Sequence, residues 1–296
     1  MSLLLQTPRA WLRRRVVAPF RPGESPLRGR TVMVTGGSSG IGAATARAVA
    51  ARGATVLLVA RRAEELARVR EDIERSGGTA YTYVCDLTDG PAVDALVAEV
   101  LDRHGAVDML VNNAGRSIRR SLKYSYDRMH DFERTMAVNY FGPVRLTLGL
   151  LPAMRAQRFG QVVNVLSWGV QVKAPRFSAY LASKSALDTW SRIAGRETYA
   201  DNVAFTNVRL SLVRTEMIRE TDVYRRSRAK TADEAALVVV RALEDRPLTI
   251  STWVGNLAEV LNLLAPRAMD AIAAAGARRF PDSPAARGVA EGTSEA

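Results

Sequence analysis

The stretch Thr35-Gly36-Gly37-Ser38-Ser39-Gly40-Ile41-Gly42 decides the fold, because it joins a short β-branched run to an alanine-rich one. The run before it, Thr31–Thr35, predicts a strand, and Ile41–Arg52, which stops at Gly53, predicts a helix. Glycines at such a junction allow a tight turn and let backbone N–H groups approach a pyrophosphate at the positive end of the helix. A glycine-rich turn alone is weak evidence, but this context predicts a dinucleotide-binding loop.

From Arg30 onward, short β-branched runs alternate with longer helical stretches. Further strands are predicted at Thr55–Ala60, Thr79–Cys85, Met109–Asn112, Gln161–Leu166 and Val203–Leu210, with Thr249–Trp253 as a candidate last strand. Helices are predicted at Ala63–Arg75, Pro91–His104, Tyr126–Gln157 and Ala179–Ala200, and from a Thr231 N-cap to about Leu243. This alternation predicts an α/β protein with a single Rossmann-type, doubly wound parallel sheet and helices on both faces.

Three parts of the chain are expected. Residues 1–27 form a basic N-terminal extension and Pro-rich linker, residues 28–255 the Rossmann-fold domain, and residues 256–296 a C-terminal helical extension with a polar tail. Residues 1–20 are either a loosely docked extension or an amphipathic basic segment on a membrane surface. The apolar stretch Leu257–Ala275 is either a lid over an apolar substrate or an amphipathic helix packed on the core or on a partner.

The composition limits the classes of protein that fit. The chain has 296 residues, of which 47% are hydrophobic, enough for a large buried core. Cys85 is the only cysteine, so no intrachain disulfide can form, and a reducing, cytoplasmic location is expected. With two histidines and one cysteine, no metal site is expected. No apolar run reaches the ~20 residues that a membrane-spanning helix needs.

The formal net charge is +12, and arginine supplies nearly all of the positive charge. Three explanations stay open: an arginine-biased surface, attraction to anionic lipid on the inner face of the membrane, and an anionic ligand. Nucleic acid is not expected as a partner, because the basic residues are scattered along the chain without an aromatic-interleaved patch.

The end of the second predicted strand indicates the cofactor. Val59-Ala60-Arg61-Arg62 stands where an acidic residue would bond the adenosine ribose 2′-hydroxyl, about 20 residues beyond the glycine loop. An acid there would repel a 2′-phosphate, whereas a guanidinium binds one bidentately. NADP(H) is therefore favoured over NAD(H), with Arg61 as the phosphate ligand. The alternative is that Arg61 only begins a solvated helix.

Further motifs follow in order. They are Cys85-Asp86-Leu87, Asn112-Asn113-Ala114-Gly115, and Ser167 with Tyr180-Leu181-Ala182-Ser183-Lys184. With the glycine loop, they make residues 28–255 resemble the short-chain dehydrogenase/reductase family. The resemblance implies a cofactor site made of Thr35, Gly36, Ser38, Ser39, Gly40, Ile41, Gly42, Arg61, Asp86, Leu87, Asn113, Ala114, Gly115, Tyr180, Lys184, Val213 and Thr215. Where the family usually has Pro-Gly, this chain has Leu-Ser, which leaves the path of the turn before Val213 open.

The same resemblance implies a catalytic group of Asn139, Ser167, Tyr180 and Lys184. Tyr180 and Lys184 are four residues apart on a predicted helix and share one face. We expect the lysine ammonium and an oxidised, cationic nicotinamide to lower the pKa of Tyr180 from ~10 toward neutral pH. Ser167 is expected to bond the substrate oxygen as negative charge develops there. Asn139 matches the family asparagine that supports a water chain to the lysine.

The segments expected around the substrate resemble bacterial family members related to fatty acyl-CoA reductases, which reduce a long-chain acyl thioester to an aldehyde with NADPH. Arg116, Arg119, Arg120 and Arg176 are then predicted to bind the phosphates of a coenzyme A or carrier-protein arm at the site mouth. They are otherwise ordinary surface charges.

Two other functions stay open. One is ketone and secondary-alcohol interconversion on another lipophilic substrate, such as a steroid, retinoid or 3-oxoacyl compound. The other is a cofactor-binding scaffold without catalysis, against which the complete catalytic group argues. The resemblance also implies a homodimer or homotetramer, paired through the helices that contain Asn139 and Tyr180.

Overall fold

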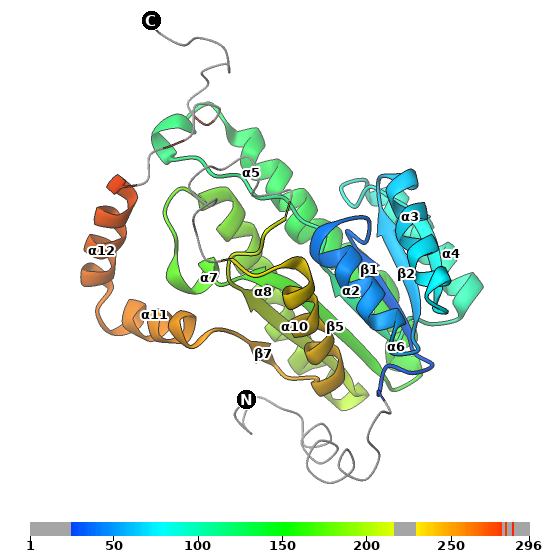
Figure 1. The fold of residues 1–296 in the computed structure, drawn as a ribbon. Helices are drawn as coiled ribbons and strands as arrows, with labels where there is room; N and C mark the ends of the chain where they lie inside the picture. Colours follow the sequence, from blue (N-terminus) through cyan, green and yellow to red (C-terminus); the bar gives the residue numbers. More distant parts are fainter. Residues whose placement is uncertain (1–24, 216–228, 280–281, 283–285, 287–296) are drawn as a thin grey trace, which may run out of the picture.

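The computed structural model describes residues 25–215, 229–279, 282 and 286. Within them, seven parallel strands form one sheet in the order β3-β2-β1-β4-β5-β6-β7 (Figure 1). The strands are β1 (Thr31–Thr35), β2 (Thr55–Ala60), β3 (Thr79–Val84), β4 (Met109–Asn112), β5 (Gly160–Ser167), β6 (Val203–Leu210) and β7 (Thr249–Ile250). The order reverses between β1 and β4, where a doubly wound sheet forms its ligand crevice. The predicted fold class is confirmed.

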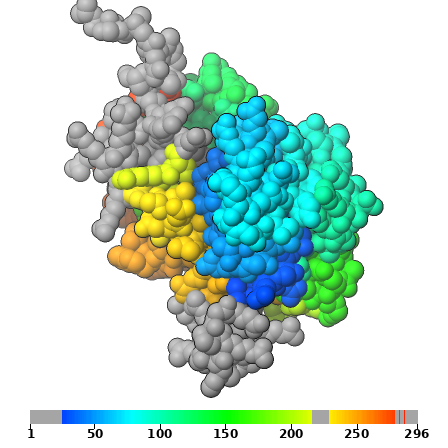
Figure 2. All heavy atoms as spheres, turned by 45° about the vertical axis from the view of Figure 1, so that its right-hand side comes forward, coloured from blue at the N-terminus to red at the C-terminus, as the bar shows by residue number. Residues whose placement is uncertain are grey.

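Helices cover both faces of the sheet. On one face, α2 (Gly40–Ala50), α3 (Ala63–Arg75) and α10 (Ala232–Asp245) pack on the sheet through a core of mostly aliphatic side chains. Figure 2 shows α2 and α10 side by side on this face, in blue and yellow. On the other face, α4 (Gly90–His104), α6 (Gly142–Ala156) and α8 (Ser178–Glu197) enclose a second core. The predicted N-cap is confirmed, since Thr231 and Glu234 form a capping box at the start of α10.

A row of buried asparagines ties α8 to the sheet. Asn112, Asn164 and Asn207 lie in register on β4, β5 and β6, and neighbouring side chains hydrogen-bond at 3.0 Å. The amide of Asn207 then donates to the Asp188 carboxylate on α8 at 2.7 Å. Asp188 lies one helical turn beyond Lys184, so this row fixes the height and rotation of the helix that carries Tyr180 and Lys184.

The long helix predicted over Tyr126–Gln157 is interrupted. A 3-10 turn (Leu122–Tyr124) precedes α5 (Met129–Met136), a π-helix (Ala137–Phe141) follows α5, and α6 begins at Gly142. Pro143 lacks the N–H that would bond the carbonyl four residues earlier, which accounts for the change of winding at this place. The π-helix contains Asn139, whose side chain is buried.

The C-terminal part differs from the predicted strand Thr249–Trp253, because β7 ends at Ile250. The Thr252 hydroxyl accepts a hydrogen bond from Gly255 N at 3.1 Å and caps α11 (Trp253–Leu264). The expected boundary between residues 255 and 256 therefore lies within this helix. After Ala265 the chain continues in α12 (Pro266–Arg279), so the stretch Leu257–Ala275 is two helices.

Two short elements complete the described chain: α7 (Gly169–Val172), which follows β5 and contacts α11, and a 3-10 turn (Tyr199–Asp201) after α8. Among the described residues, no helix is long and apolar enough to span a membrane. Residues 1–20, for which a membrane contact is predicted, lie outside the described residues, as does most of the polar tail.

Candidate active site

The predicted site residues gather at the carboxyl edge of the sheet. The glycine loop follows β1, Arg61 follows β2 and Asp86 follows β3. On the other side of the crevice, Asn113 follows β4 and Ser167 ends β5. Because parallel strands end at the same edge, segments far apart in sequence meet here.

The glycine loop is held in a shape that only glycine permits at two positions. Gly36 has a φ of +64°, and a Cβ on Gly42 would lie 2.1 Å from the Gly36 carbonyl oxygen. The Asn113 amide donates to the Thr35 carbonyl oxygen at 2.9 Å, and the Thr35 hydroxyl accepts from Asn113 N at 3.0 Å. The loop and the wall after β4 therefore form one bonded unit.

The start of α2 fits the pyrophosphate of a dinucleotide. Ser39 is the N-cap residue, but its side chain makes no capping hydrogen bond to the first turn. The first N–H groups of a helix point outward with a partial positive charge, which favours an anion. The predicted cofactor residues Ser38, Ser39, Gly40, Ile41 and Gly42 all belong to this turn or lead into it.

At the other end of the crevice, Arg61 lies beside Asp86. Their side chains form an ion pair with an N–O distance of 3.6 Å, and the Arg61 side chain is 73% exposed. Asp86 also accepts from Thr88 N and Thr88 Oγ1, at 2.9 and 2.8 Å. These hydrogen bonds and the Arg61 charge outweigh the effect of burial and lower the pKa of Asp86. Arg61 thus presents an accessible guanidinium where a ribose phosphate is expected, while Leu87 is buried against the core.

Asn139 fastens the wall after β4 to the π-helix. Its side-chain amide donates to the Arg116 carbonyl oxygen and to Ser183 Oγ, and its oxygen accepts from Arg116 N, all at 2.9 Å. A Cβ on Gly115 would meet Asn139 Oδ1 at 2.9 Å and Lys184 Nζ at 3.2 Å. Asn139, Gly115 and Lys184 therefore lie in one cluster. Ser183, which sequence analysis did not identify, belongs to it because it follows Tyr180 by almost one helical turn.

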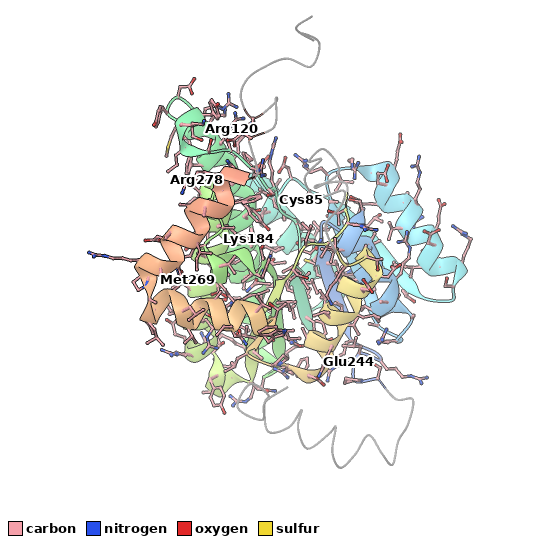
Figure 3. All side chains as sticks on the ribbon, turned by 60° about the vertical axis from the view of Figure 1, so that its left-hand side comes forward. Cys85, Arg120, Lys184, Glu244, Met269 and Arg278 are labelled. Carbon is pink, nitrogen blue, oxygen red and sulfur yellow. The ribbon has the colours of Figure 1, made fainter. Side chains whose placement is uncertain are left out.

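Ser167, Tyr180 and Lys184 meet where β5 ends against α8. Lys184 lies in the interior of the molecule (Figure 3), 3% exposed, and its Nζ donates to the Val165 carbonyl oxygen at 3.0 Å. Ser167 Oγ accepts from Gly169 N at 3.1 Å, which orients the hydroxyl at the strand end. Ser167 also lies near enough to Tyr180 to lower the pKa of its phenol. The structure thus brings together all four residues predicted for the catalytic group.

Burial shifts the pKa of both central groups. It raises the pKa of Tyr180 to about 12, against a smaller lowering by the nearby Ser167 side chain. It lowers the pKa of Lys184 to about 8. In the protein alone, burial outweighs the effect of the neighbouring groups on the phenolate. Tyr180 therefore holds its proton at neutral pH, as a proton donor must. The lowering expected from Lys184 together with an oxidised nicotinamide stays a prediction.

The segment after β6 adopts no left-handed backbone conformation at Ser211 or Leu212, although it has Leu-Ser where the family usually has Pro-Gly. Among the described residues, the non-glycine positions with positive φ do not include Ser211 or Leu212. Val213 forms a parallel bridge with Lys230, and Arg214 N donates to the Lys230 carbonyl oxygen at 2.8 Å. The Thr215 methyl lies 3.3 Å from the Cβ position of Gly40, so this segment reaches the glycine loop.

Two of the four arginines predicted to bind substrate phosphates have another role. The buried Asp282 carboxylate pairs with Arg176 at 3.3 Å and accepts from Ser121 N and Oγ at 3.0 and 2.7 Å. Arg120 pairs with Asp131 at 3.2 Å and bonds the Ala286 carbonyl oxygen. Arg120 and Arg176 thus anchor the segment after α12 instead of presenting free cations. The contacts with Ala286 and Asp282 could not be predicted from the sequence, because these residues lie more than a hundred residues from Arg120 and Arg176.

The other two arginines differ in their surroundings. Arg116 is exposed beside Asn139. Arg119 is only partly exposed and lies near enough to Asp282 to lower its pKa.

A doubly wound sheet, a glycine turn at its switch point and a Tyr-Lys pair on a buried helix face define a dinucleotide-binding oxidoreductase. A family model of the short chain dehydrogenases matches residues 30–224. The chain belongs to the short-chain dehydrogenase/reductase family and is an NAD(P)-dependent oxidoreductase.

Individual relatives agree with this assignment. The chain is 49% identical over 265 residues to an uncharacterized oxidoreductase of Mycobacterium bovis, covering 88% of this chain and 78% of that one. It is 46% identical over 265 residues to a fatty acyl-CoA reductase of Acinetobacter baylyi, covering 90% of each. Among solved structures, a 3-oxoacyl-(acyl-carrier-protein) reductase of Agrobacterium tumefaciens with NADP bound has a TM-score of 0.71 at 30% identity, covering 78% of this chain and 93% of that one.

Proposed function

We propose that this protein reduces long-chain acyl-CoA to the aldehyde with NADPH. The observation that carries the proposal is the 46% identity to a fatty acyl-CoA reductase across 90% of both chains. A match of 265 residues extends beyond the cofactor-binding half and includes α8 and α11. The catalytic group proposed for this reaction is Asn139, Ser167, Tyr180 and Lys184.

NADP(H) is the proposed cofactor. The Arg61 side chain is 73% exposed, and its ion pair with Asp86 has a distance of 3.6 Å. Breaking such an exposed ion pair costs little free energy, so the guanidinium can turn to a 2′-phosphate. The glycine loop and the start of α2 are proposed to hold the pyrophosphate. Lys184, beside Gly115, is proposed to hold the nicotinamide ribose.

The reaction uses the protein groups as proton donors and orienters. A bound nicotinamide supplies a hydride to the thioester carbon. Ser167 and Tyr180 hydrogen-bond the carbonyl oxygen, and Tyr180 passes its proton to that oxygen as negative charge develops. The resulting hemithioacetal loses its C–S bond, the carbonyl reforms, and the hydroxyl proton leaves to the thiolate. The products are an aldehyde, free coenzyme A and the oxidised cofactor, with Tyr180 reprotonated from solvent.

A second candidate substrate is a ketone or its secondary alcohol on a lipophilic molecule. The observation that favours it is the structural match, with a TM-score of 0.71, to a 3-oxoacyl reductase. The same four residues serve that reaction, since it differs only in having no leaving thiol.

The proposed assembly is a homodimer or homotetramer paired through the helices that contain Asn139 and Tyr180. Two large apolar side chains support it, because Phe141 in the π-helix and Leu148 in α6 are 60% and 54% exposed. Exposed apolar side chains on one helical segment are typical of a subunit contact.

The test is an NADPH-oxidation assay of the purified protein with palmitoyl-CoA, in which thiol release is followed with a chromogenic disulfide. We expect one thiol for each NADPH consumed. Oxidation of NADPH by ketones without any thiol release from acyl-CoA would exclude the acyl-CoA proposal in favour of the second candidate. In Tyr180→Phe, turnover should be lost while NADPH binding, measured by fluorescence, is retained; normal turnover would remove Tyr180 from the mechanism.

A further inference from the structure

Helix α11 packs on the protein with its polar side. Asn256, Glu259 and Asn262 make hydrogen bonds or ion pairs with the body of the molecule. The apolar residues buried on this helix are only Gly255 and Ala258. A helix on the surface of a globular protein normally does the reverse, with its apolar stripe toward the core and its polar residues in water.

The orientation of α11 is fixed by specific contacts. Gln171 of α7, which is 1% exposed, donates to Asn256 Oδ1 at 3.0 Å and to Glu259 Oε2 at 2.9 Å. Asn262 donates to the Gln171 carbonyl oxygen at 2.9 Å. A Cβ on Gly255 would lie only 2.3 Å from Gln171 Oε1, so glycine is needed for this close approach. Rotation of the helix about its axis would break all of these contacts.

A second anchor reaches α11 from the sheet. Arg209 of β6 pairs with Glu259 at 3.1 Å and with Asp188 of α8 at 2.8 Å. The Arg209 side chain is 12% exposed and that of Glu259 is 52% exposed, so water reaches this ion pair from the side of the glutamate. The polar side of α11 is thereby joined to the helix that carries Tyr180.

The opposite side of α11 presents a continuous apolar surface to solvent. We call it the outer face of α11; it consists of Trp253, Val254, Leu257, Val260, Leu261, Leu263 and Leu264, of which Trp253, Leu263 and Leu264 are 76%, 81% and 74% exposed. Figure 2 shows α11 in orange at the edge of the molecule, below α10. Seven apolar side chains exposed together on a helix held in one orientation mark a contact with an apolar partner.

We propose that the outer face of α11 binds the surface of an anionic lipid bilayer, with the helix lying in the plane of the interface. The helix has 12 residues and extends about 18 Å, too short to cross the ~30 Å hydrocarbon layer. Leucine, valine and a terminal tryptophan are the side chains that such interfacial helices insert.

The charge of the protein favours an anionic lipid surface as the occupant. The formal net charge is +12, so an anionic bilayer attracts the protein as a whole. Exposed cations lie near α11, with Lys173 at the end of α7, which contacts α11, and Arg267 at the start of α12. The nearby acids are Asp188 and Glu259, which share the single charge of Arg209, and Asp270 of α12.

The experiment is co-sedimentation of the full-length protein with vesicles. One set of vesicles is pure phosphatidylcholine and the other is an equal mixture of phosphatidylcholine and phosphatidylglycerol. We expect binding to the mixed vesicles that weakens with added salt. The double variant Leu257→Glu/Leu264→Glu should lower the partition into these vesicles about tenfold or more, because two leucines lose their burial in lipid. Leu237→Glu on α10, at a side chain that is 55% exposed, is the matched control and should bind like the unmodified protein.

The remaining outcomes count against the proposal. Full binding by the double variant would place the lipid contact elsewhere in the chain, and absence of binding by the unmodified protein would overturn it outright. If the double variant instead lowers the molar mass in solution without affecting vesicle binding, the outer face of α11 is an interface between copies. Unchanged melting temperature and NADPH binding in the double variant show that it is folded. These readouts do not depend on acyl-CoA reduction, so the proposal stands or fails independently of the proposed function.

Discussion

Replacing Asn139 by alanine tests whether this residue holds the cofactor wall in place. Its side chain is 0% exposed and makes three hydrogen bonds of 2.9 Å, two with the backbone of Arg116 and one with Ser183 Oγ. Alanine removes all three and leaves the N–H and the carbonyl of Arg116 without these partners. The segment from Asn113 to Arg116 is then attached to the π-helix only by packing.

The magnitude follows from these three contacts. Each hydrogen bond contributes about 1 kcal/mol net, and a buried polar group left without a partner costs about 1–3 kcal/mol. Because Arg116 is exposed, water can reach part of its backbone, so we take the lower part of this range. The free energy of unfolding of Asn139→Ala should therefore fall by about 3 kcal/mol, a large share of the ~5–15 kcal/mol typical of a folded protein.

The assay is urea denaturation followed by circular dichroism and by tryptophan fluorescence in parallel. We expect a lower midpoint with an unchanged slope, which indicates a loss of stability without a change in the surface exposed on unfolding. Gln157→Ala is the matched control, because Gln157 is exposed and makes one hydrogen bond, at 2.8 Å, to the nearby Phe159 carbonyl oxygen. Its effect should stay within about 0.5 kcal/mol.

A loss below about 1 kcal/mol in Asn139→Ala would refute the reasoning. Asn139 would then act only in the chemistry, through water or cofactor, and the wall would be held by other contacts. A loss of the expected size together with a raised KM for NADPH would support the role of Asn139 as a positioning residue.

Three further predictions concern cofactor preference, pH and the C-terminal anchor. In Arg61→Asp the KM for NADPH should rise about tenfold or more while the KM for NADH falls, because a carboxylate repels a 2′-phosphate. Arg62→Ala is the control. An unchanged cofactor preference in Arg61→Asp would make Arg61 an ordinary surface charge. NADPH binding, measured by fluorescence, should weaken as pH rises through about 8, where Lys184 loses its proton. Lys184→Met should abolish this pH dependence. If the variant retains it, another group is responsible for the pH dependence. Asp282→Ala should speed trypsin cleavage at the end of α12 about tenfold, because the two hydrogen bonds and the ion pair of Asp282 hold that segment. An unchanged cleavage rate would show that α12 is held without these contacts.

The sequence determined the sheet, the glycine loop and the place of the Tyr-Lys pair. The strands at Thr31–Thr35 and Thr55–Ala60 have the predicted bounds, because a buried parallel strand reads as a continuous β-branched and aliphatic run. The Thr231 capping box was equally readable, since its residues lie within one turn. These features depend on local sequence. Because strands alternate with helices, the sheet is parallel, and the carboxyl ends of its strands all lie at one edge.

Tertiary structure decided what depends on distant partners. Arg120 and Arg176 read as free cations in the sequence, but packing brings them to the segment around Asp282. In the protein alone the pKa of Tyr180 is raised, because burial depends on everything packed around α8. For α11, the sequence showed an apolar side and a polar side but could not say which faces the protein. Gln171 and Arg209 decide that, and both come from elements more than forty residues before the helix. Sequence periodicity fixes which residues share a face, and only the contacts of the folded chain fix where that face points.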